Sequence, residues 1–348
     1  MRPALRSDTS ALCLASLLAL ILLLPVLLLW GGLPPRSEAY KSMSTASATV
    51  GTVIQAIYQS PPEGDIVFLG SSLVSAGISQ STVSLALSEH LHRDVSVQVL
   101  AVNWPGLDVQ YFMLRDYLNA HKAHLLVWNL PEPHSRAYEY PQIQAYRWMR
   151  FGEYSDALRG LPINYRLALY GEAVIGAPRQ FLSVLRPNLI RDEGTAIDPK
   201  LARSGYLGAQ FIQDNSLPKS PANEAMLVSL NSPDIAVKGP APGPYQMHFA
   251  KLIVKLAKQH NCRVVLLHIP LDAEFNDTSI PELSDWRAEL GPDLTMIGAP
   301  ASRLFSGMDH SHFDRFYRDA HLNENGTHYF TQAILPALLH SYNESPSR

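Results

Sequence analysis

The chain has 348 residues, of which 47% are hydrophobic and 17% are charged, and its formal net charge at pH 7 is -3. This composition predicts a packed core rather than a disordered chain, and the length allows one large domain or two small ones. No long basic run or basic–aromatic stripe is present, so the sequence lacks the electrostatic features of a nucleic-acid-binding protein.

The first feature along the chain is an uncharged apolar segment at residues 11–30. Its length is about that needed to cross a bilayer as a helix. Arg2 and Arg6 precede it, so the positive-inside rule predicts that residues 1–10 are cytoplasmic and that the rest of the chain is extracytoplasmic. We therefore expect a single-pass anchor in the inner (cell) membrane, with the remaining domain in the periplasm.

A cleaved signal peptide is the competing interpretation of this segment. Its apolar region is usually shorter, and Ser37-Glu38-Ala39 is a poor cleavage site, so we favour the uncleaved anchor. Residues 31–62 are predicted to form a stalk that contains a short juxtamembrane helix over Thr45–Tyr58. The main domain is then expected over residues 63–348.

The two cysteines, Cys13 and Cys262, fall in the anchor and at the start of a predicted strand. They cannot pair across that separation, so no disulfide is expected. Cys262 is interpreted as a small buried apolar side chain.

Short apolar runs alternate with amphipathic stretches from residue 64 onward. Strands are predicted over Ile66–Gly70, Val95–Val102 and His124–Leu130, and helices over Ser79–His92 and from Asp108, as its N-cap, to about Ala120. This alternation is typical of a parallel sheet that is covered by helices on both faces.

The alternation stops over residues 135–244, which we interpret as a helical insertion. Trp148–Tyr170 is predicted to be helical with a break at Pro162, and Ala173–Leu185 is a weaker helical candidate. Ser216–Gly243 carries five prolines and is interpreted as loop. Two roles stay open for the insertion: part of a substrate groove, or a helical cover without a direct role.

The alternation resumes near residue 246. A helix is predicted over Gln246–His260, strands over Cys262–Ile269 and Leu294–Ile297, a His/Asp-rich loop over residues 302–323, and a closing helix over Glu324–Leu339. The predicted fold class is therefore α/β: a three-layer parallel sheet flanked by helices, with a helical insertion and an N-terminal transmembrane helix.

Polar residues follow the predicted strands, where ligands of an open parallel sheet usually bind. Ser71 and Ser72 follow the first strand, Asn129 ends the third, and Asp319 and His321 precede the last helix. A serine becomes a nucleophile when a base takes its proton and a third group orients the base. In an extended segment, residues i and i+2 point to the same side, so Asp319 can lie beside His321.

These segments resemble the blocks of the SGNH (GDSL-like) hydrolase superfamily, whose sheet is flavodoxin-like. Gly70-Ser71-Ser72-Leu73 matches the first block with Ser71 in place of the usual Asp, Asn103-Trp104-Pro105-Gly106 is similar to the second, and Asp319-Ala320-His321-Leu322-Asn323 matches the last with one intervening residue instead of two. Asn129 lies in Trp-Asn-Leu-Pro rather than in the Gly-x-Asn-Asp of the third block.

The resemblance implies that Ser72 is the nucleophile, His321 the general base and Asp319 its orienting carboxylate. It also implies an oxyanion hole formed by the backbone N–H groups of Ser72 and Gly106 with the side chain of Asn129. Neither a cofactor nor a metal is implied. The resemblance covers roughly residues 64–135 and 246–340.

A membrane-anchored domain with Gly-Ser-Ser and Asp-x-His resembles one branch of that superfamily, which acts in bacterial envelope O-acylation and includes alginate O-acetylation proteins and the D-alanyl transfer protein of teichoic acids. This resemblance implies a serine-dependent O-acyltransferase or esterase acting on acyl groups, with acetyl the expected group, of a cell-envelope or exported polysaccharide. It also implies an acyl-donor substrate and a membrane-bound O-acyltransferase as partner.

Two other interpretations stay open. A polysaccharide-binding or assembly protein without catalysis would use aromatic side chains such as Trp104, Trp128 and Trp148 to stack on sugars. A metallohydrolase would use the run Asp309-His310-Ser311-His312-Phe313-Asp314, which contains metal-ligating residue types in a predicted loop.

Several single residues have alternative roles. Ser71 is the rival nucleophile, although we expect it to shape the turn. Asp314 is a second carboxylate for the same base, and Asp319 is a candidate helix cap. His268 is interpreted as a residue that packs in the core or supports the site residues from behind, rather than as a base.

Overall fold

The structure is a computed structural model. It describes residues 7–30, 36–41, 50–60, 64–102, 106–129, 157–171, 173–174, 216–218, 227–229, 237–238, 243–276, 281–282, 289–291, 294–318 and 321–344. The chain divides into two compact units, the first formed by Met1–Ser44 with Pro141–Thr195 and the second by Thr45–Tyr140 with Ala196–Arg348. Each unit is described by itself.

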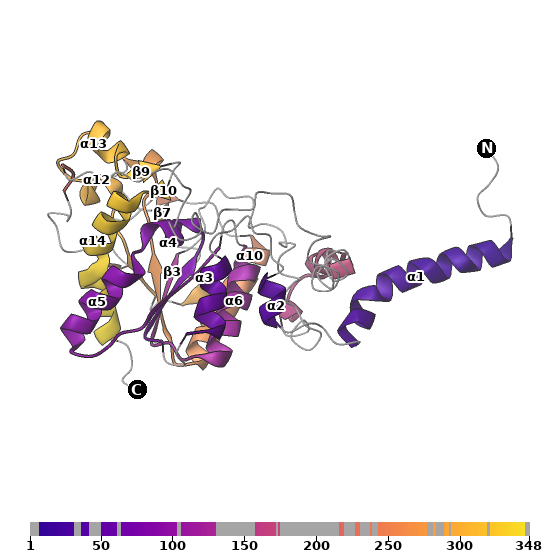
Figure 1. The fold of residues 1–348 in the computed structure, drawn as a ribbon. Coiled ribbons are helices and arrows are strands. Elements are labelled where there is room, and N and C mark those ends of the chain that lie inside the picture. The colour runs from indigo at the N-terminus through magenta and orange to yellow at the C-terminus, as the bar shows by residue number, and fades with distance from the viewer. Residues whose placement is uncertain are drawn as a thin grey trace. The chain divides into compact units, whose positions relative to one another are not determined.

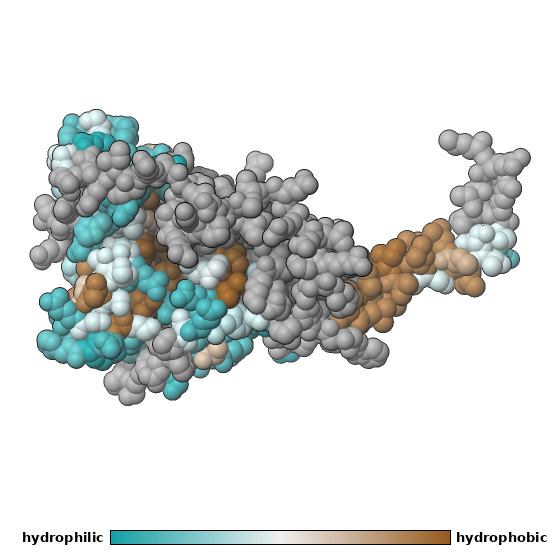
Figure 2. All heavy atoms as spheres, in the orientation of Figure 1, coloured by the Kyte–Doolittle hydropathy of each residue, from teal (hydrophilic) through white to brown (hydrophobic). Residues whose placement is uncertain are grey.

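The first unit contains a long apolar helix, α1, over Asp8–Trp30, and a short helix, α2, over Arg36–Lys41. The stretch Asp8–Leu28 is long and apolar enough to cross a membrane. Its large side chains are exposed and form the hydrophobic surface of α1 in Figure 2. The predicted N-terminal apolar helix is thus confirmed as a helix of membrane-spanning length.

The insertion falls mostly outside the described residues, as does nearly all of the helix predicted over Ala173–Leu185. Of the segment Trp148–Tyr170, residues 157–171 are described, and their main helical stretch begins at residue 163, directly after Pro162. The helix break predicted at Pro162 is therefore present.

The second unit is built around a six-stranded sheet with the order β2-β1-β3-β6-β8-β4. Five strands are parallel: β1 (Ile66–Gly70), β2 (Val97–Ala101), β3 (Leu125–Asn129), β6 (Arg263–Leu267) and β8 (Thr295–Ile297). The strand β4 (Leu227–Ser229) pairs antiparallel with β8 at one edge. The parallel sheet predicted from the sequence is confirmed: β1 has the predicted bounds, and each of the other four parallel strands is shorter than predicted by one to three residues.

Helices cover both faces of this sheet (Figure 1). On one face α6 (Leu107–Ala120) packs against α3 (Val50–Tyr58) and α10 (Pro244–Gln259). On the other face α14 (Glu324–Asn343) packs against α4 (Ser72–Gly77) and α5 (Gln80–Leu91). Every residue of β1 and β3 is buried, as expected for central strands with helices on both sides.

Several boundaries differ from the sequence predictions. Helix α3, expected as part of a stalk, packs against β2 and α6 and buries Val50, Val53, Ala56 and Ile57. The N-cap of α6 is Gly106, so the prediction that Asp108 caps this helix is wrong. Asp108 lies in the first turn and is fully buried, where its Oδ2 accepts a 2.7 Å hydrogen bond from the Tyr245 hydroxyl.

The two regions predicted as loop contain short elements. Residues 216–243 include β4 and the strand β5 (Val237–Lys238), which pairs with β7 (Pro281–Glu282). Residues 302–323 include part of α12 (Ala301–Leu304), α13 (His310–Asp314), β9 (Tyr317–Arg318) and β10 (His321–Leu322). These elements are too short to produce a readable hydrophobic period, so the sequence pattern did not predict them.

Candidate active site

The site begins where β1 ends and α4 starts. A side chain at Gly70 would meet Val74 and would lie 3.0 Å from Cβ of Asn129, so glycine lets β3 and α4 approach this strand end closely. Ser71 is the N-cap of α4, because its side chain accepts a hydrogen bond from the backbone N–H of Leu73 at 3.3 Å. Ser72 is the first residue of the helix.

The imidazole comes from the other end of the chain. His321 lies in β10, which pairs antiparallel with β9 through His321↔Arg318 and Leu322↔Tyr317. Strand β10 packs against α4, and the buried side chain of Leu322 joins the core. The short hairpin therefore holds His321 beside the start of α4.

The hydroxyl and the imidazole lie within hydrogen-bond distance. Ser72 Oγ is 2.9 Å from His321 Nε2, although the two residues are 249 positions apart in sequence. Ser72 is buried, with 8% of its surface exposed, and His321 is half-buried. With Nε2 unprotonated, the ring is placed to accept the hydroxyl proton, which is the geometry required of a serine and its general base.

The third member of the predicted triad, Asp319, lies outside the described residues. Arg318 and His321 on either side of it are paired in the β9–β10 hairpin. The orienting role of Asp319 therefore stays a prediction.

Two of the predicted oxyanion donors stand at helix starts. The backbone N–H of Ser72 is at the first position of α4, where no intrahelical acceptor exists. Gly106 is the N-cap of α6, and in the first turn of this helix Asp108 Oδ1 accepts a 2.8 Å hydrogen bond from the backbone N–H of Val109. Its neighbours Asn103, Trp104 and Pro105 lie outside the described part of the chain.

Asn129 is the last residue of β3 and is buried, with 6% of its surface exposed. Its Nδ2 donates a 3.1 Å hydrogen bond to the carbonyl of Leu267. That bond fixes the amide at the carboxyl end of the sheet and leaves its second N–H for another acceptor. The sheet order reverses between β1 and β3, so Ser72 and Asn129 both lie at the point where doubly wound sheets bind ligands.

The residues of the run 309–314, proposed as metal ligands, form a helix cap and pair with one another. Asp309 is the N-cap of α13 and lies 2.8 Å from Nδ1 of His312, while His310 pairs with Asp314 at 2.9 Å. Hydrogen bonds from Ser311 and His312 lower the pKa of Asp309 well below its usual range. Within the described segments, no group of three His, Cys, Asp or Glu residues is placed to hold a metal.

The structure also gives the surroundings of Asp314 and His268. Asp314 is exposed and pairs with His310, so the prediction that it is a second carboxylate for the base is not supported by any contact in the described residues. His268 Nε2 lies 3.1 Å from Glu274 Oε2, and both side chains are largely buried beyond the end of β6.

The aromatic residues proposed to stack on sugars do not include Trp128. Its side chain is fully buried and donates a 2.8 Å hydrogen bond to Oε1 of Gln110. The prediction of a sugar-stacking role for Trp128 is therefore wrong, because no ligand reaches a fully buried ring. Trp104 and Trp148 lie outside the described residues.

Asn323 is a positioning residue that the sequence analysis did not single out. Its Oδ1 accepts a 3.1 Å hydrogen bond from the backbone N–H of Gly326 and caps α14, while its Nδ2 donates to the carbonyl of Arg315 at 2.8 Å. Both bonds fix the segment that carries His321. An Asn directly before a predicted helix is an N-cap signal, and that signal was available in the sequence.

The hairpin is also fixed by a partly buried tyrosine. Tyr317 in β9 donates a 3.0 Å hydrogen bond to the carbonyl of Pro270. Burial, with the nearby charges of Glu274 and Asp272, raises the pKa of Tyr317 far above its usual range. The phenol therefore serves as a hydrogen-bond donor that ties β9 to the segment after β6.

No family model and no curated protein matches the sequence. The contact between Ser72 and His321 is therefore the observation on which a functional proposal rests. A buried hydroxyl next to an imidazole, with helix N–H groups and an amide at the same sheet edge, has the parts needed for acyl transfer through a serine ester.

Proposed function

We propose that the protein is a membrane-anchored serine O-acyltransferase or esterase that acts outside the cytoplasm on acyl groups of a cell-envelope or exported polysaccharide. The observation that carries the proposal is the 2.9 Å separation of Ser72 Oγ and His321 Nε2. The resemblance of the segments around these two residues to SGNH hydrolases supplies the reaction class.

The proposed reaction has two steps. His321 takes the proton of Ser72 as its oxygen attacks the acyl carbonyl, and the donor's alcohol leaves with that proton, which forms an acyl-enzyme on Ser72. An acceptor hydroxyl, from water or a sugar, then gives its proton to His321, attacks the ester and releases Ser72. Asp319 orients the imidazole in this scheme.

Charge on the tetrahedral oxygen would be stabilised by the N–H groups of Ser72 and Gly106 together with the amide of Asn129. One donor of this kind contributes about 3–4 kcal/mol to transition-state stabilisation. The start of α6 adds the positive end of a 14-residue helix at Gly106.

The apolar helix α1 supports the proposed location. A single-pass anchor with a cytoplasmic N-terminus would hold the catalytic unit at the outer surface of the inner membrane, where envelope polysaccharides are modified. A membrane-bound O-acyltransferase that delivers acyl groups across the membrane is the proposed partner.

Labelling with a fluorophosphonate probe tests the nucleophile. We expect the full-length protein in detergent micelles to be labelled and Ser72→Ala to be unlabelled, because the probe reacts with an activated serine. His321→Ala and Asp319→Asn should slow labelling by about 100-fold or more, since a general base contributes roughly 10²–10⁴ in rate.

Ser71→Ala is the matched control for this experiment, because it removes a neighbouring hydroxyl and keeps Ser72. It should still be labelled, although the helix cap is lost. Labelling that disappears in Ser71→Ala and persists in Ser72→Ala would move the nucleophile, and a folded wild-type protein that no acyl or phosphonyl probe labels would contradict the enzyme proposal.

A further inference from the structure

A short helix of the insertion exposes two large apolar side chains. In the described part of the chain, the large apolar residues that are exposed outside α1 are Tyr58, Leu85, Ile163 and Leu167. The first two lie on separate helices. Ile163 and Leu167 both belong to helical residues 163–171, with 67% and 65% of their surfaces exposed. Residues four apart are neighbours on one face of a helix, so these two form an exposed apolar strip.

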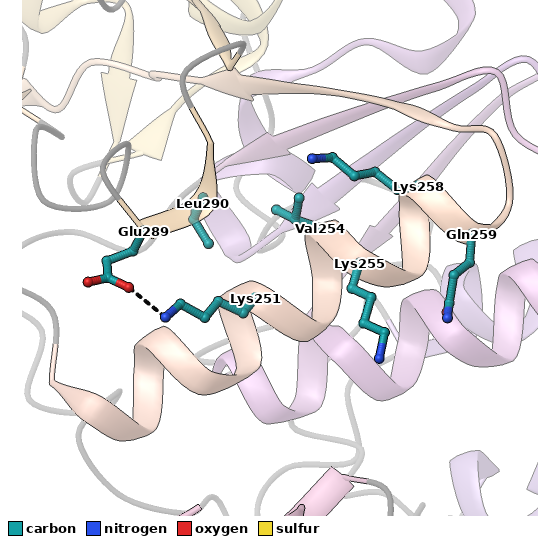
Figure 3. Close-up of a pocket in the computed structure, with 7 residues that line it drawn as sticks. All are labelled: Lys251, Val254, Lys255, Lys258, Gln259, Glu289 and Leu290. Atoms are coloured by element: carbon teal, nitrogen blue, oxygen red, sulfur yellow. Dashed lines mark hydrogen bonds and ion pairs between the residues drawn. The ribbon is translucent and has the colours of Figure 1, made fainter. Parts of the chain in front are cut away.

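The groove beside α10 offers no comparable surface (Figure 3). Its apolar residues Val254 and Leu290 are only 4% and 6% exposed. Lys251 is paired with Glu289 at 2.5 Å, and Lys255 extends away from that pair. These contacts select no class of ligand.

The face that carries the strip also contacts α1. Tyr170 follows Ile163 by seven residues and Leu167 by three, and this spacing places all three on one side of the helix. The Tyr170 hydroxyl donates a hydrogen bond to the backbone carbonyl of Leu22 in α1. Both segments belong to the first unit. The apolar strip therefore adjoins the apolar surface of α1.

The contact lies toward the C-terminal end of α1. Leu22 is eight residues before Trp30, the end of the helix, which corresponds to about 12 Å along the axis. Pro25 is buried and both of its neighbours are half-buried, whereas residues 8–23 are exposed. A bilayer that surrounds the exposed part of α1 would therefore reach the 163–171 helix at this end.

The composition around the strip fits the interface of a membrane. Leu169, on the opposite side of the helix, is fully buried, so that side packs within the protein. Residues 157–171 contain Arg159 and Arg166, both exposed, and no Asp or Glu. Apolar residues combined with basic and tyrosine side chains are typical of helices that lie in the interface and contact anionic headgroups.

We propose that the 163–171 helix is a second membrane contact of the protein. Ile163 and Leu167 enter the acyl chains of the leaflet around the C-terminal end of α1, and Arg159 and Arg166 face its anionic headgroups. The contact limits the tilt of the first unit against the bilayer. It requires that α1 lies in the membrane and does not depend on the proposed acyl transfer.

Fluorescence quenching by spin-labelled lipids tests the proposal. The full-length protein with Cys13→Ser and Leu167→Cys is labelled with the fluorophore NBD and reconstituted into vesicles of phosphatidylcholine and phosphatidylglycerol. Cys262 is 3% exposed and burial raises its pKa to about 12, so it should stay unlabelled. Acyl-chain spin labels should quench the fluorophore by about twofold or more, since interfacial helices reach roughly 5–10 Å into the acyl boundary.

Leu85→Cys is the matched control, because it labels an exposed leucine of α5 in the second unit, and it should be quenched weakly. Wild-type protein labelled at the exposed Cys13 reports whether α1 itself lies in the bilayer. Quenching at Cys13 without quenching at Leu167→Cys would overturn the second contact and leave the anchor intact.

Three other results would also overturn the proposal. Equal quenching at Leu85→Cys would show that the fluorophore itself partitions into lipid. Quenching of Leu167→Cys by headgroup spin labels alone would place the helix above the acyl chains. A fluorophore at Leu167→Cys shielded from both spin-labelled lipid and aqueous iodide would indicate that protein, such as a second copy of this chain, covers the strip.

Discussion

Ser71 and Ser72 are adjacent serines with different surroundings. Ser71 has an extended backbone and caps α4, whereas Ser72 is already helical and directs its hydroxyl toward His321. Asp, which the resembled family carries at the position of Ser71, is also a preferred N-cap residue. Either residue can therefore cap a helix at this position, and in this chain the Ser71 side chain does so directly before Ser72.

Asp65, directly before β1, is a buried carboxylate with several hydrogen-bond donors. Arg93 contacts both of its oxygens, at 2.7 and 3.2 Å, the backbone N–H of Ser96 donates at 2.9 Å, and the Tyr342 hydroxyl donates at 2.8 Å. Burial by itself would raise the pKa of Asp65, but these hydrogen bonds outweigh it and lower the pKa. Asp65 thus ties β1 to the end of α14.

We expect Asp65→Asn to lower the free energy of unfolding by about 2 kcal/mol at pH 7, since hydrogen bonds to a charged group contribute about 1.5–3 kcal/mol. For a unit of this size, the melting temperature should fall by roughly 4–8 °C. Tryptophan fluorescence during heating of the full-length protein in micelles measures the change.

The lowered pKa of Asp65 determines how its contribution to the free energy of unfolding changes with pH. Because the pKa of Asp65 is lowered in the folded state, its stabilisation is present above the unfolded value of 3.8 and is lost as pH falls through the folded value. The difference between wild type and Asp65→Asn should therefore be constant from pH 7 to 5 and shrink below 3.8. A difference that grows on acidification would contradict the assignment.

At the scale of elements, the β9–β10 hairpin depends on the start of α14. The backbone N–H of Asn323 donates to the carbonyl of Phe316 at 2.8 Å, and Gly326 approaches the same carbonyl so closely that a side chain there would clash. His321 lies two residues before this cap. Positioning of the imidazole is thus a property of the hairpin and helix together.

Asn323→Ala should lower the free energy of unfolding by about 1 kcal/mol, the usual cost of losing an N-cap. It should also slow phosphonate labelling of Ser72, because the segment that carries His321 loses two hydrogen bonds. Asn323→Asp keeps the cap acceptor and loses the donor to Arg315, so an intermediate labelling rate is expected. Unchanged labelling in Asn323→Ala would show that the hairpin does not need the cap.

The long strands and helices and their order along the chain were predictable from the sequence. The short elements were not. Strands such as β1 and β3 are continuous apolar runs between turn residues, so their pattern is readable. Strand β4 has three residues and α13 has five, and each is held by pairing or capping that a local pattern does not reveal. Hence residues 216–243 and 302–323 were expected to be loops.

The same limit applies to the site. A parallel sheet predicts which strand ends meet, so the proximity of Ser72 to the segment near residue 321 could be predicted from topology. The burial of individual aromatic and acidic residues could not be predicted from the topology. Trp128 and Asp108 are buried because α6 and α10 both pack on that face, and this requires knowledge of the helix layers.

At the scale of the whole molecule, α1 is notable because it is long and apolar enough to cross a membrane. The side chains of Leu12, Leu17 and Leu22 are more than half exposed. Exposure of so much apolar surface to water along a 23-residue helix is energetically unfavourable. The hydrocarbon core of a bilayer would cover them. The central testable question is whether this helix stays attached to the chain in the membrane.

We expect Leu18→Arg with Leu22→Arg to move the protein out of the alkali-resistant membrane fraction of a bacterial host, since each arginine near the helix centre costs about 2.5–3.5 kcal/mol of insertion free energy. Leu18→Ala with Leu22→Ala is the matched control and should remain in the membrane, because the helix stays apolar. Mass spectrometry of the wild-type protein decides the competing interpretation. An intact N-terminus on membrane-bound chains supports an anchor, whereas a soluble chain that begins after Ala39 would show that the segment is a cleaved signal.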